Sequence, residues 1–249
     1  MNEPFSGIDV TTLLQIDSSA RFGRSGHDRH GSHTRRMTDH FVRHWLARAP
    51  QTEVLVRDVA ATPPRPVDDR WIEAAFTPAD HRTAEMAAIL RESDQLVDEL
   101  ERADLIVVGA PMYNFGVPSP LKAWIDNVVR VGRTFGFDRG RPGAPYWPLL
   151  APGKKLIVLS ARGDGGYGAG GPLEAANLVD ASIRVPLAYV GVTDFRSIAA
   201  EWDEFADARV RESLKSAEAD IEGLVTQLAP SRPRVDPQLI LAQAIHADP

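Results

Sequence analysis

A short segment with chemically useful side chains directly follows an apolar run of the chain. The run covers residues 105–110 (LIVVGA), and the segment after Pro111 reads Met112, Tyr113, Asn114, Phe115 and Gly116. Two aromatic rings can stack on a flat ring, and an amide side chain both donates and accepts hydrogen bonds. Core packing is the usual role of an isolated aromatic pair, but here the pair follows the end of a predicted strand. We therefore expect Tyr113 and Phe115 to stack against a flat, polar ligand.

A second polar segment follows the apolar residues 12–16. It runs from Ser18 to Gly31 and leads into a helical pattern that begins near Ser32, His33 and Thr34. Hydroxyl groups at a helix N-terminus, with free backbone N–H groups and the positive end of the helix dipole, favour phosphate binding. Neither GxxxxGK[ST] nor GxGxxG occurs here, which excludes those two nucleotide motifs. Helix capping alone by Ser32 or Thr34 is the alternative, and it is compatible with anion binding.

A third candidate segment is rich in glycine. Residues 160–171 (SARGDGGYGAGG) follow another apolar run, and they contain six glycines and Arg162. Glycine lets the backbone approach a ligand closely, and an arginine can face a carbonyl group or a developing negative charge. A mobile surface loop with a solvated arginine is the alternative.

The three segments need a scaffold that brings them together. Alternating or continuous apolar patterns predict five strands, and patterns of three- and four-residue spacing predict the intervening helices. The strands are predicted at 12–16, 53–59, 105–110, 155–159 and 193–199. The helices are predicted at 32–49, 83–102, 120–131 and 205–228, and a further helix follows Pro172 and ends at about Arg184. A short helical piece is expected at 71–75 and an irregular stretch at 132–152.

This alternation predicts an α/β fold with a five-stranded parallel sheet and helices on both faces, for which we expect the doubly wound order 2-1-3-4-5. In that order the first, third and fourth strands are adjacent, so their polar loops converge at the carboxyl edge of the sheet. We assign residues 12–228 to one domain, 1–11 to an N-terminal extension and 229–249 to a C-terminal tail.

Composition limits the classes of function. The 249 residues are 43% hydrophobic, carry a net charge of −6 and include no cysteine, which excludes disulfides and thiolate chemistry. The mixed charges argue against a nucleic-acid partner, although basic residues cluster between Arg21 and Arg36. The first eleven residues lack a signal-peptide pattern and no apolar run suggests a membrane span, so we expect a cytoplasmic protein. His27, His30 and His33 lie close in sequence without a metal-binding pattern, so no metal is predicted.

Several motifs together resemble a known family. They are SSA at 18–20, APMYNF at 110–115, SPLKAWID at 119–126, RVGRTF at 130–135 and SARGDGG at 160–166. In this combination the chain resembles the FMN-dependent NADH:quinone oxidoreductases of the azoreductase type, from about Leu13 to Glu201. The segment around residues 112–115 is the most specific part of the resemblance.

The resemblance implies a flavodoxin-like fold with FMN bound non-covalently. It implies that Ser18, Ser32, His33 and Thr34 hold the phosphate, that Pro111, Met112, Tyr113, Asn114 and Phe115 line the isoalloxazine ring, and that Ala161, Arg162, Gly163 and Asp164 border its other edge. NADH or NADPH would deliver two electrons and leave before a quinone or azo compound takes them, a ping-pong reaction without a protein nucleophile. The family also implies a homodimer, with Phe135 or Trp147 reaching the partner's site.

The chain departs from the family around the substrate face. The loop at 20–31 is longer, the stretch at 140–148 is more elaborate, a tail follows Leu228, Ala161 replaces a serine, and no histidine occurs at 164–171. These departures affect the identity of the substrate more than flavin binding. The arginines of the long loop favour the 2′-phosphate of NADPH as a hypothesis.

Two other functions fit the same pattern. A flavodoxin-type electron carrier would need a strongly acidic face for its redox partners, which the mixed charges do not favour. A flavin-less flavodoxin-like scaffold acting in regulation would fail to take up FMN.

Overall fold

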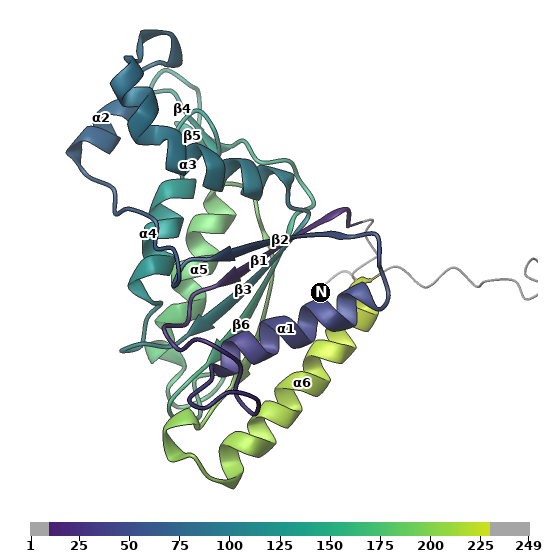
Figure 1. Ribbon diagram of the computed structural model, residues 1–249. Coiled ribbons are helices and arrows are strands. Elements are labelled where there is room, and N and C mark those ends of the chain that lie inside the picture. Colours follow the sequence, from purple (N-terminus) through teal and green to yellow (C-terminus); the bar gives the residue numbers. More distant parts are fainter. Residues whose placement is uncertain (1–9, 230–249) are drawn as a thin grey trace, which may run out of the picture.

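The sheet has the predicted parallel order. The computed structural model describes residues 10–229, and its five-stranded sheet has the order β2-β1-β3-β6-β7, which is 2-1-3-4-5 in terms of the five predicted strands (Figure 1). The strands are β1 (Thr12–Asp17), β2 (Glu53–Asp58), β3 (Leu105–Pro111), β6 (Lys155–Ala161) and β7 (Asp194–Ala200). The flavodoxin-like fold class is confirmed.

Helices cover both faces of the sheet because successive strand residues point to opposite sides. Leu13 and Leu105 belong to the core beneath α1 (His33–Leu46) and α6 (Ala208–Leu228). Leu14 and Ile106, one position further along, belong to the opposite core. That second core contains α3 (Ala84–Arg102), α4 (Ser119–Val128) and α5 (Leu178–Tyr189). A short helix, α2 (Asp69–Phe76), packs on α3 at the end of the molecule (Figure 1).

The strand register aligns the carboxyl ends of four strands. Asp17 of β1 pairs with Gly109 of β3, Pro111 pairs with Ala161 of β6, and Ala161 pairs with Ala200 of β7. The segments that follow these strands therefore leave from one edge of the sheet. The three predicted loops meet there, and the segment after β7 joins them.

One predicted irregular stretch contains regular structure. Within residues 132–152 a two-stranded antiparallel hairpin forms between β4 (Phe135–Phe137) and β5 (Tyr146–Pro148). The prediction missed it because each strand has only three residues, too few to show a period. A tight contact holds the hairpin, since a Cβ on Gly136 would lie 2.0 Å from the ring of Trp147.

Two helix boundaries also differ from the sequence prediction. Helix α5 continues past Arg184 to Tyr189 and includes Pro186. Pro186 removes one helical hydrogen bond, but Ile183 and Leu187 are fully buried and hold this part of the helix on the core. Helix α6 begins only at Ala208, after a 3-10 turn at Asp203–Phe205. The N-terminal extension up to residue 9 and the tail from residue 230 lie outside the described residues.

Candidate active site

A pocket lies at the carboxyl edge of the sheet and is built from four segments. The loops after β1, β3 and β6 and the turn after β7 all contribute to it. Its lining residues are Ser19, Arg21, Ser32, His33, Pro111, Met112, Tyr113, Ala161, Gly163, Asp203 and Glu204. Seven of these were predicted from the sequence: Ser32, His33, Pro111, Met112, Tyr113, Ala161 and Gly163.

The N-terminus of α1 forms one side of the pocket. Ser32 is the N-cap, and its hydroxyl accepts a hydrogen bond from the backbone N–H of Arg35 at 3.2 Å. Among the described residues, the backbone N–H groups of His33 and Thr34 have no hydrogen-bond acceptor. These first-turn donors, together with the helix dipole, favour a phosphate group.

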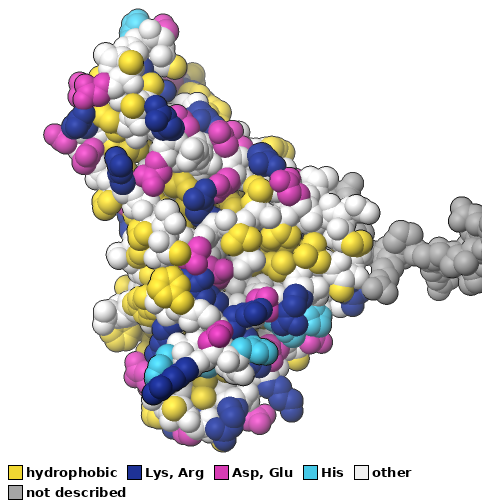
Figure 2. Space-filling view, viewed as in Figure 1, with side chains coloured by type: hydrophobic (Ala, Val, Ile, Leu, Met, Phe, Trp, Pro, Cys, Tyr) yellow, Lys and Arg dark blue, Asp and Glu magenta, His cyan; other side chains and the backbone are white. Residues whose placement is uncertain are grey.

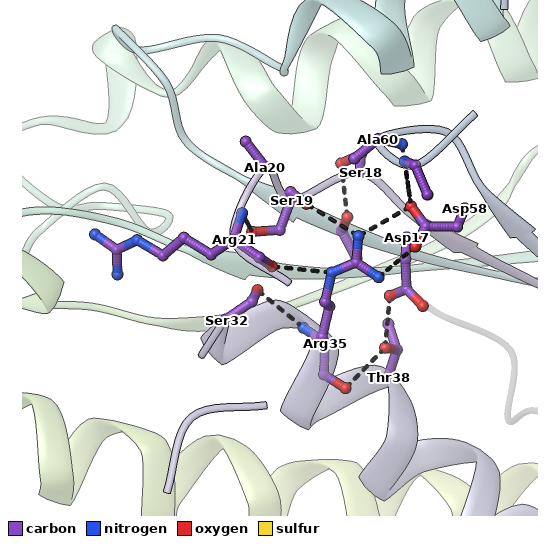
Figure 3. A network of polar contacts seen from close by, with 12 residues as sticks. Asp17, Ser18, Ser19, Ala20, Arg21, Ser32, Arg35, Thr38, Asp58 and Ala60 are labelled. Carbon is purple, nitrogen blue, oxygen red and sulfur yellow. Dashed lines mark hydrogen bonds and ion pairs between the residues drawn. The ribbon is translucent and has the colours of Figure 1, made fainter. Parts of the chain in front are cut away.

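Arg35 fixes the loop that faces this helix end. Its guanidinium donates two hydrogen bonds to the carboxylate of Asp58, at 2.6 and 2.9 Å. It also donates to the backbone carbonyls of Ser19 and Arg21, both at 3.0 Å (Figure 3). Burial alone would raise the pKa of Asp58, but the hydrogen bonds from Arg35 and from nearby backbone amides outweigh burial and lower that pKa. A bidentate ion pair therefore holds the Ser19–Arg21 segment against the pocket.

A small residue and a buried carboxyl group let α1 approach the sheet closely. A Cβ on Gly109 would lie 2.8 Å from the Thr38 methyl group and 3.1 Å from a carboxyl oxygen of Asp17. Thr38 and Gln15 donate to the Asp17 carboxylate at 2.8 and 2.7 Å. Burial raises the pKa of Asp17 despite these hydrogen bonds. This packing sets the position of the helix end that carries Ser32 and His33.

The aromatic segment after β3 forms a tight turn. Tyr113 and Gly116 exchange two backbone hydrogen bonds, of 2.9 and 3.1 Å, and the residues between them have positive φ values of 47° at Asn114 and 69° at Phe115. Two central residues with positive φ indicate a type I′ turn, in which a phenylalanine is strained. Phe115 is 52% exposed, so its own packing does not explain the conformation. Strain of this kind clusters at ligand sites.

The same turn connects to the other pocket segments. The hydroxyl of Tyr113 accepts a hydrogen bond from the backbone N–H of Ala20 at 3.2 Å. The backbone N–H of Met112 donates to the carbonyl of Ala161 at 2.8 Å. Within residues 10–229, the backbone N–H groups of Asn114, Phe115 and Gly163 have no acceptor. These exposed or half-buried donors are available to the polar edge of a ring.

The turn after β7 is a wall of the pocket that the sequence prediction missed. Asp203 lies 3.0 Å from Nε2 of His33 and 3.5 Å from the guanidinium of Arg21. The hydrogen bond from His33 lowers the pKa of Asp203 against the opposing effect of burial, and the charge of Arg21 contributes to the lowering. The available signal was the polar stretch after the fifth strand, whose carboxyl end lies at the same edge.

Six predicted residues do not line the pocket: Asn114 and Phe115 of the exposed turn, and Ser18, Thr34, Arg162 and Asp164. The buried hydroxyl of Ser18 donates to the carbonyl of Gly109 at 2.7 Å, and the neighbouring Ser19 lines the pocket instead. The buried Thr34 hydroxyl lies 3.0 Å from that of Ser32.

Arg162 and Asp164 also lie outside the pocket lining. Arg162 is 3% exposed and turns toward Asp180 (3.1 Å) and Glu201 (3.5 Å), which border a neighbouring hollow. Asp164 accepts a hydrogen bond from the backbone of Gly165.

Comparison with known proteins agrees with this geometry. A family model for the flavodoxin-like fold matches residues 14–223. An FMN-dependent NADH:quinone oxidoreductase of Colwellia psychrerythraea is 41% identical over 219 residues, which cover 88% of this chain and 100% of the relative. The chain belongs to the FMN-dependent NADH:quinone oxidoreductase family. It is therefore an oxidoreductase.

Other members of the family and solved structures support the assignment. An FMN-dependent NAD(P)H:quinone oxidoreductase of Pseudomonas aeruginosa is 40% identical over 84% of this oxidoreductase and 95% of the relative. An FMN-dependent NADH-azoreductase from Bacillus anthracis, solved in complex with FMN, has a TM-score of 0.74 at 18% identity and covers 88% of this chain and all of its own. At that identity the structural likeness shows the common fold.

Proposed function

We propose that this oxidoreductase binds FMN at the pocket and transfers two electrons from NADH to a quinone. The observation that carries the proposal is the convergence, at one sheet edge, of an anion-binding helix end with a strained aromatic turn. Family membership supports the same function and disfavours both a carrier without its own substrates and a flavin-less scaffold.

The residues of the pocket fit FMN. The free N–H groups of His33 and Thr34 and the hydroxyls of Ser19 and Ser32 suit its phosphate. Arg21 and His33 place further hydrogen-bond donors at this end of the pocket, beside the Asp203 carboxylate.

The other end of the pocket suits the flavin ring. Pro111, Met112 and Tyr113 would lie along it, with Ala161 and Gly163 at the opposite side. The free backbone donors of Asn114, Phe115 and Gly163 suit its carbonyl oxygens. When bound, FMN supplies the two-electron redox chemistry, and the protein binds and orients the reactants.

The exposed turn suits a stacking surface for both reactants. Tyr113 lines the pocket and is 37% exposed, and Phe115 of the same turn is 52% exposed, so their rings would offer an accessible aromatic face to the reactants. Nicotinamide and acceptor would compete for this face, so the donor leaves before the acceptor binds, as in a ping-pong reaction. Azo compounds are flat aromatic acceptors and are proposed as a second substrate class.

Several of the arginines that suggested a preference for NADPH form ion pairs within the protein. Arg24, Arg35 and Arg36 form ion pairs with Asp39, Asp58 and Glu218. These arginines are engaged within the protein and do not support a 2′-phosphate site.

The face shown in Figure 2 has interspersed acidic and basic side chains and no basic stripe, in line with small-molecule partners. No described helix has the length and apolar character that crossing a membrane requires.

A homodimer is proposed through the face formed by α5 and the β4–β5 hairpin. Leu178, Val185 and Tyr189 of α5 and Tyr146 of the hairpin are 39–60% exposed, and Tyr146 and Tyr189 have ring centroids 6.0 Å apart. The backbone N–H of Leu178 donates to the carbonyl of Phe115 at 3.1 Å, so this face is continuous with the proposed active site. A second copy seated there would border the substrate.

The proposal is tested on purified protein. We expect a flavin absorbance spectrum, oxidation of NADH that depends on added quinone, and parallel double-reciprocal plots for the two substrates. A protein that neither carries nor takes up FMN would contradict the proposal. Light scattering should show a dimer that V185D dissociates, whereas V56D, at a similarly exposed valine of β2, should leave it intact.

A further inference from the structure

A polar seam joins α1 and α6, which pack side by side on one face of the sheet (Figure 1). Arg36 donates two hydrogen bonds to Glu218, at 2.7 and 2.9 Å. One turn further along each helix, His40 faces Glu222 with an Nε2–Oε1 distance of 3.2 Å. Arg36 and His40, four residues apart on α1, therefore face Glu218 and Glu222, which are four residues apart on α6.

Two histidines of α1 converge on the one carboxylate. His44 follows His40 by four residues, and its Nε2 atom lies 3.7 Å from the same Oε1 atom of Glu222. The two imidazole rings have centroids 4.3 Å apart. The three potential ligand atoms all lie within 4.8 Å of one another.

These separations are close to those of a coordinated metal. Zinc–nitrogen and zinc–oxygen bonds of about 2.0 Å in a tetrahedron put neighbouring ligand atoms roughly 3.3 Å apart. The distances of 3.2 and 3.7 Å from the two imidazoles to Glu222 bracket that value. The ligand atoms of the two imidazoles lie within 4.8 Å of each other, and side-chain rotation would bring all three atoms to the spacing of a tetrahedral site.

We propose that His40, His44 and Glu222 bind a divalent transition metal of the Zn²⁺ type across the α1–α6 seam. Two imidazoles and one carboxylate are ligands that Zn²⁺ accepts with a further position open to water. Mg²⁺ and Ca²⁺ prefer oxygen ligands and do not suit this set. The metal would fasten α1, whose N-terminus lines the pocket, to α6.

The three side chains are accessible from solvent. His40, His44 and Glu222 are 13%, 38% and 52% exposed, so an ion can enter from solvent. Figure 2 shows histidine side chains at the surface in the region of α1, beside acidic and basic groups.

Two features make the site testable by binding alone. The chain contains no cysteine, so no thiolate competes for Zn²⁺. The site is separate from the proposed FMN pocket, so metal binding is measured independently of flavin content or turnover. Failure of one proposal is therefore distinguishable from failure of the other.

The experiment is calorimetric titration of Zn²⁺ into the tag-free, full-length protein, with Mg²⁺ as a control ion. We expect one equivalent of Zn²⁺ to bind and to raise the midpoint of thermal unfolding, and Mg²⁺ to do neither. H44A and E222Q should each weaken Zn²⁺ binding at least about 10-fold, since loss of even an outer partner of a metal ligand costs that much. The double variant H27A/H30A, in the exposed loop after β1, should bind like the wild type.

Three results would overturn the proposal. They are the absence of stoichiometric Zn²⁺ binding, unchanged affinity in both H44A and E222Q, and loss of binding in H27A/H30A. Far-ultraviolet circular dichroism of each variant checks that the helices persist. Because E222Q keeps the size of the side chain, its loss of affinity reports a missing ligand rather than a repacked seam.

Discussion

Replacement of Arg35 by alanine tests how the phosphate side of the pocket is held. Arg35 is 12% and Asp58 28% exposed at their side chains, so the pair lies between a surface and a buried ion pair. Surface pairs contribute up to about 1 kcal/mol and disruption of buried ones costs about 3–5 kcal/mol. We expect R35A to lower the free energy of unfolding by about 2 kcal/mol.

We expect R35A to reduce the free energy of FMN binding by more than it reduces the free energy of unfolding. Without Arg35, the carbonyls of Ser19 and Arg21 lose their donor, and residues 19–21 at the start of the loop after β1 are released. Ordering three residues again on binding costs about 1 kcal/mol each, or about 3 kcal/mol in total. This corresponds to an increase of roughly 100-fold in the dissociation constant of FMN.

The matched control is R36A, at the next residue of the same helix. Arg36 also makes a bidentate ion pair, with Glu218, but no hydrogen bond from it to the pocket loop is found among the described residues. Urea unfolding should show comparable destabilisation of the two variants, whereas titration of the apoprotein with FMN should show weak binding only for R35A. Equal FMN affinity of R35A and R36A would refute the positioning role.

Three further variants probe the pocket and its support. The hydrogen bond from His33 lowers the pKa of Asp203, so the Asp203 carboxylate stabilises the fold above its unfolded pKa of about 3.9 and loses this effect as pH falls through its folded pKa. In urea unfolding, D203N should therefore be less stable than the wild type near neutral pH and equally stable in acid. A difference in stability that does not depend on pH would contradict this reasoning. F115G should relieve the positive φ of 69°, leaving stability within about 1 kcal/mol, while kcat/KM for a quinone falls about 10-fold; unchanged kcat/KM would exclude Phe115 from the stacking surface. G109A should destabilise the protein by about 1–3 kcal/mol, because the added Cβ would lie 2.8 Å from a side-chain methyl group of α1. G223A, on the open face of α6, should instead stabilise the protein by up to about 1 kcal/mol. Thermal unfolding of both variants tests this difference, and equal effects would refute it.

The sequence predicted the parts of the fold that depend on local patterns. Five apolar runs of the right length, separated by helical periodicity, predicted a parallel sheet, and the resemblance to the flavodoxin-like family indicated its order. The carboxyl ends of parallel strands meet at one edge, so the convergence of the segments at Ser32, Tyr113 and Gly163 followed from that order. The hairpin at 135–148 escaped prediction because its strands are too short to display a period.

Side-chain direction at the strand ends depended on the tertiary structure. Ser18 and Ser19 are equivalent in sequence terms, but the first donates to Gly109 of the neighbouring strand and the second lines the pocket. Arg162 was a reasonable pocket residue by position, yet its guanidinium turns to Asp180 and Glu201. Residues at a strand end can face either side of the sheet, and cross-strand neighbours decide which side.

The sequence by itself therefore determined the scaffold, the edge that carries the site and the residue types that suit a flavin. Only the tertiary structure brought Asp203 to His33, and Glu222 to His40 across 182 positions of the chain. Such pairs have no local signal, because they arise when elements far apart in the sequence pack next to one another. Site residues that lie within one segment could be predicted from the sequence, whereas sites formed by residues from distant segments required the tertiary structure.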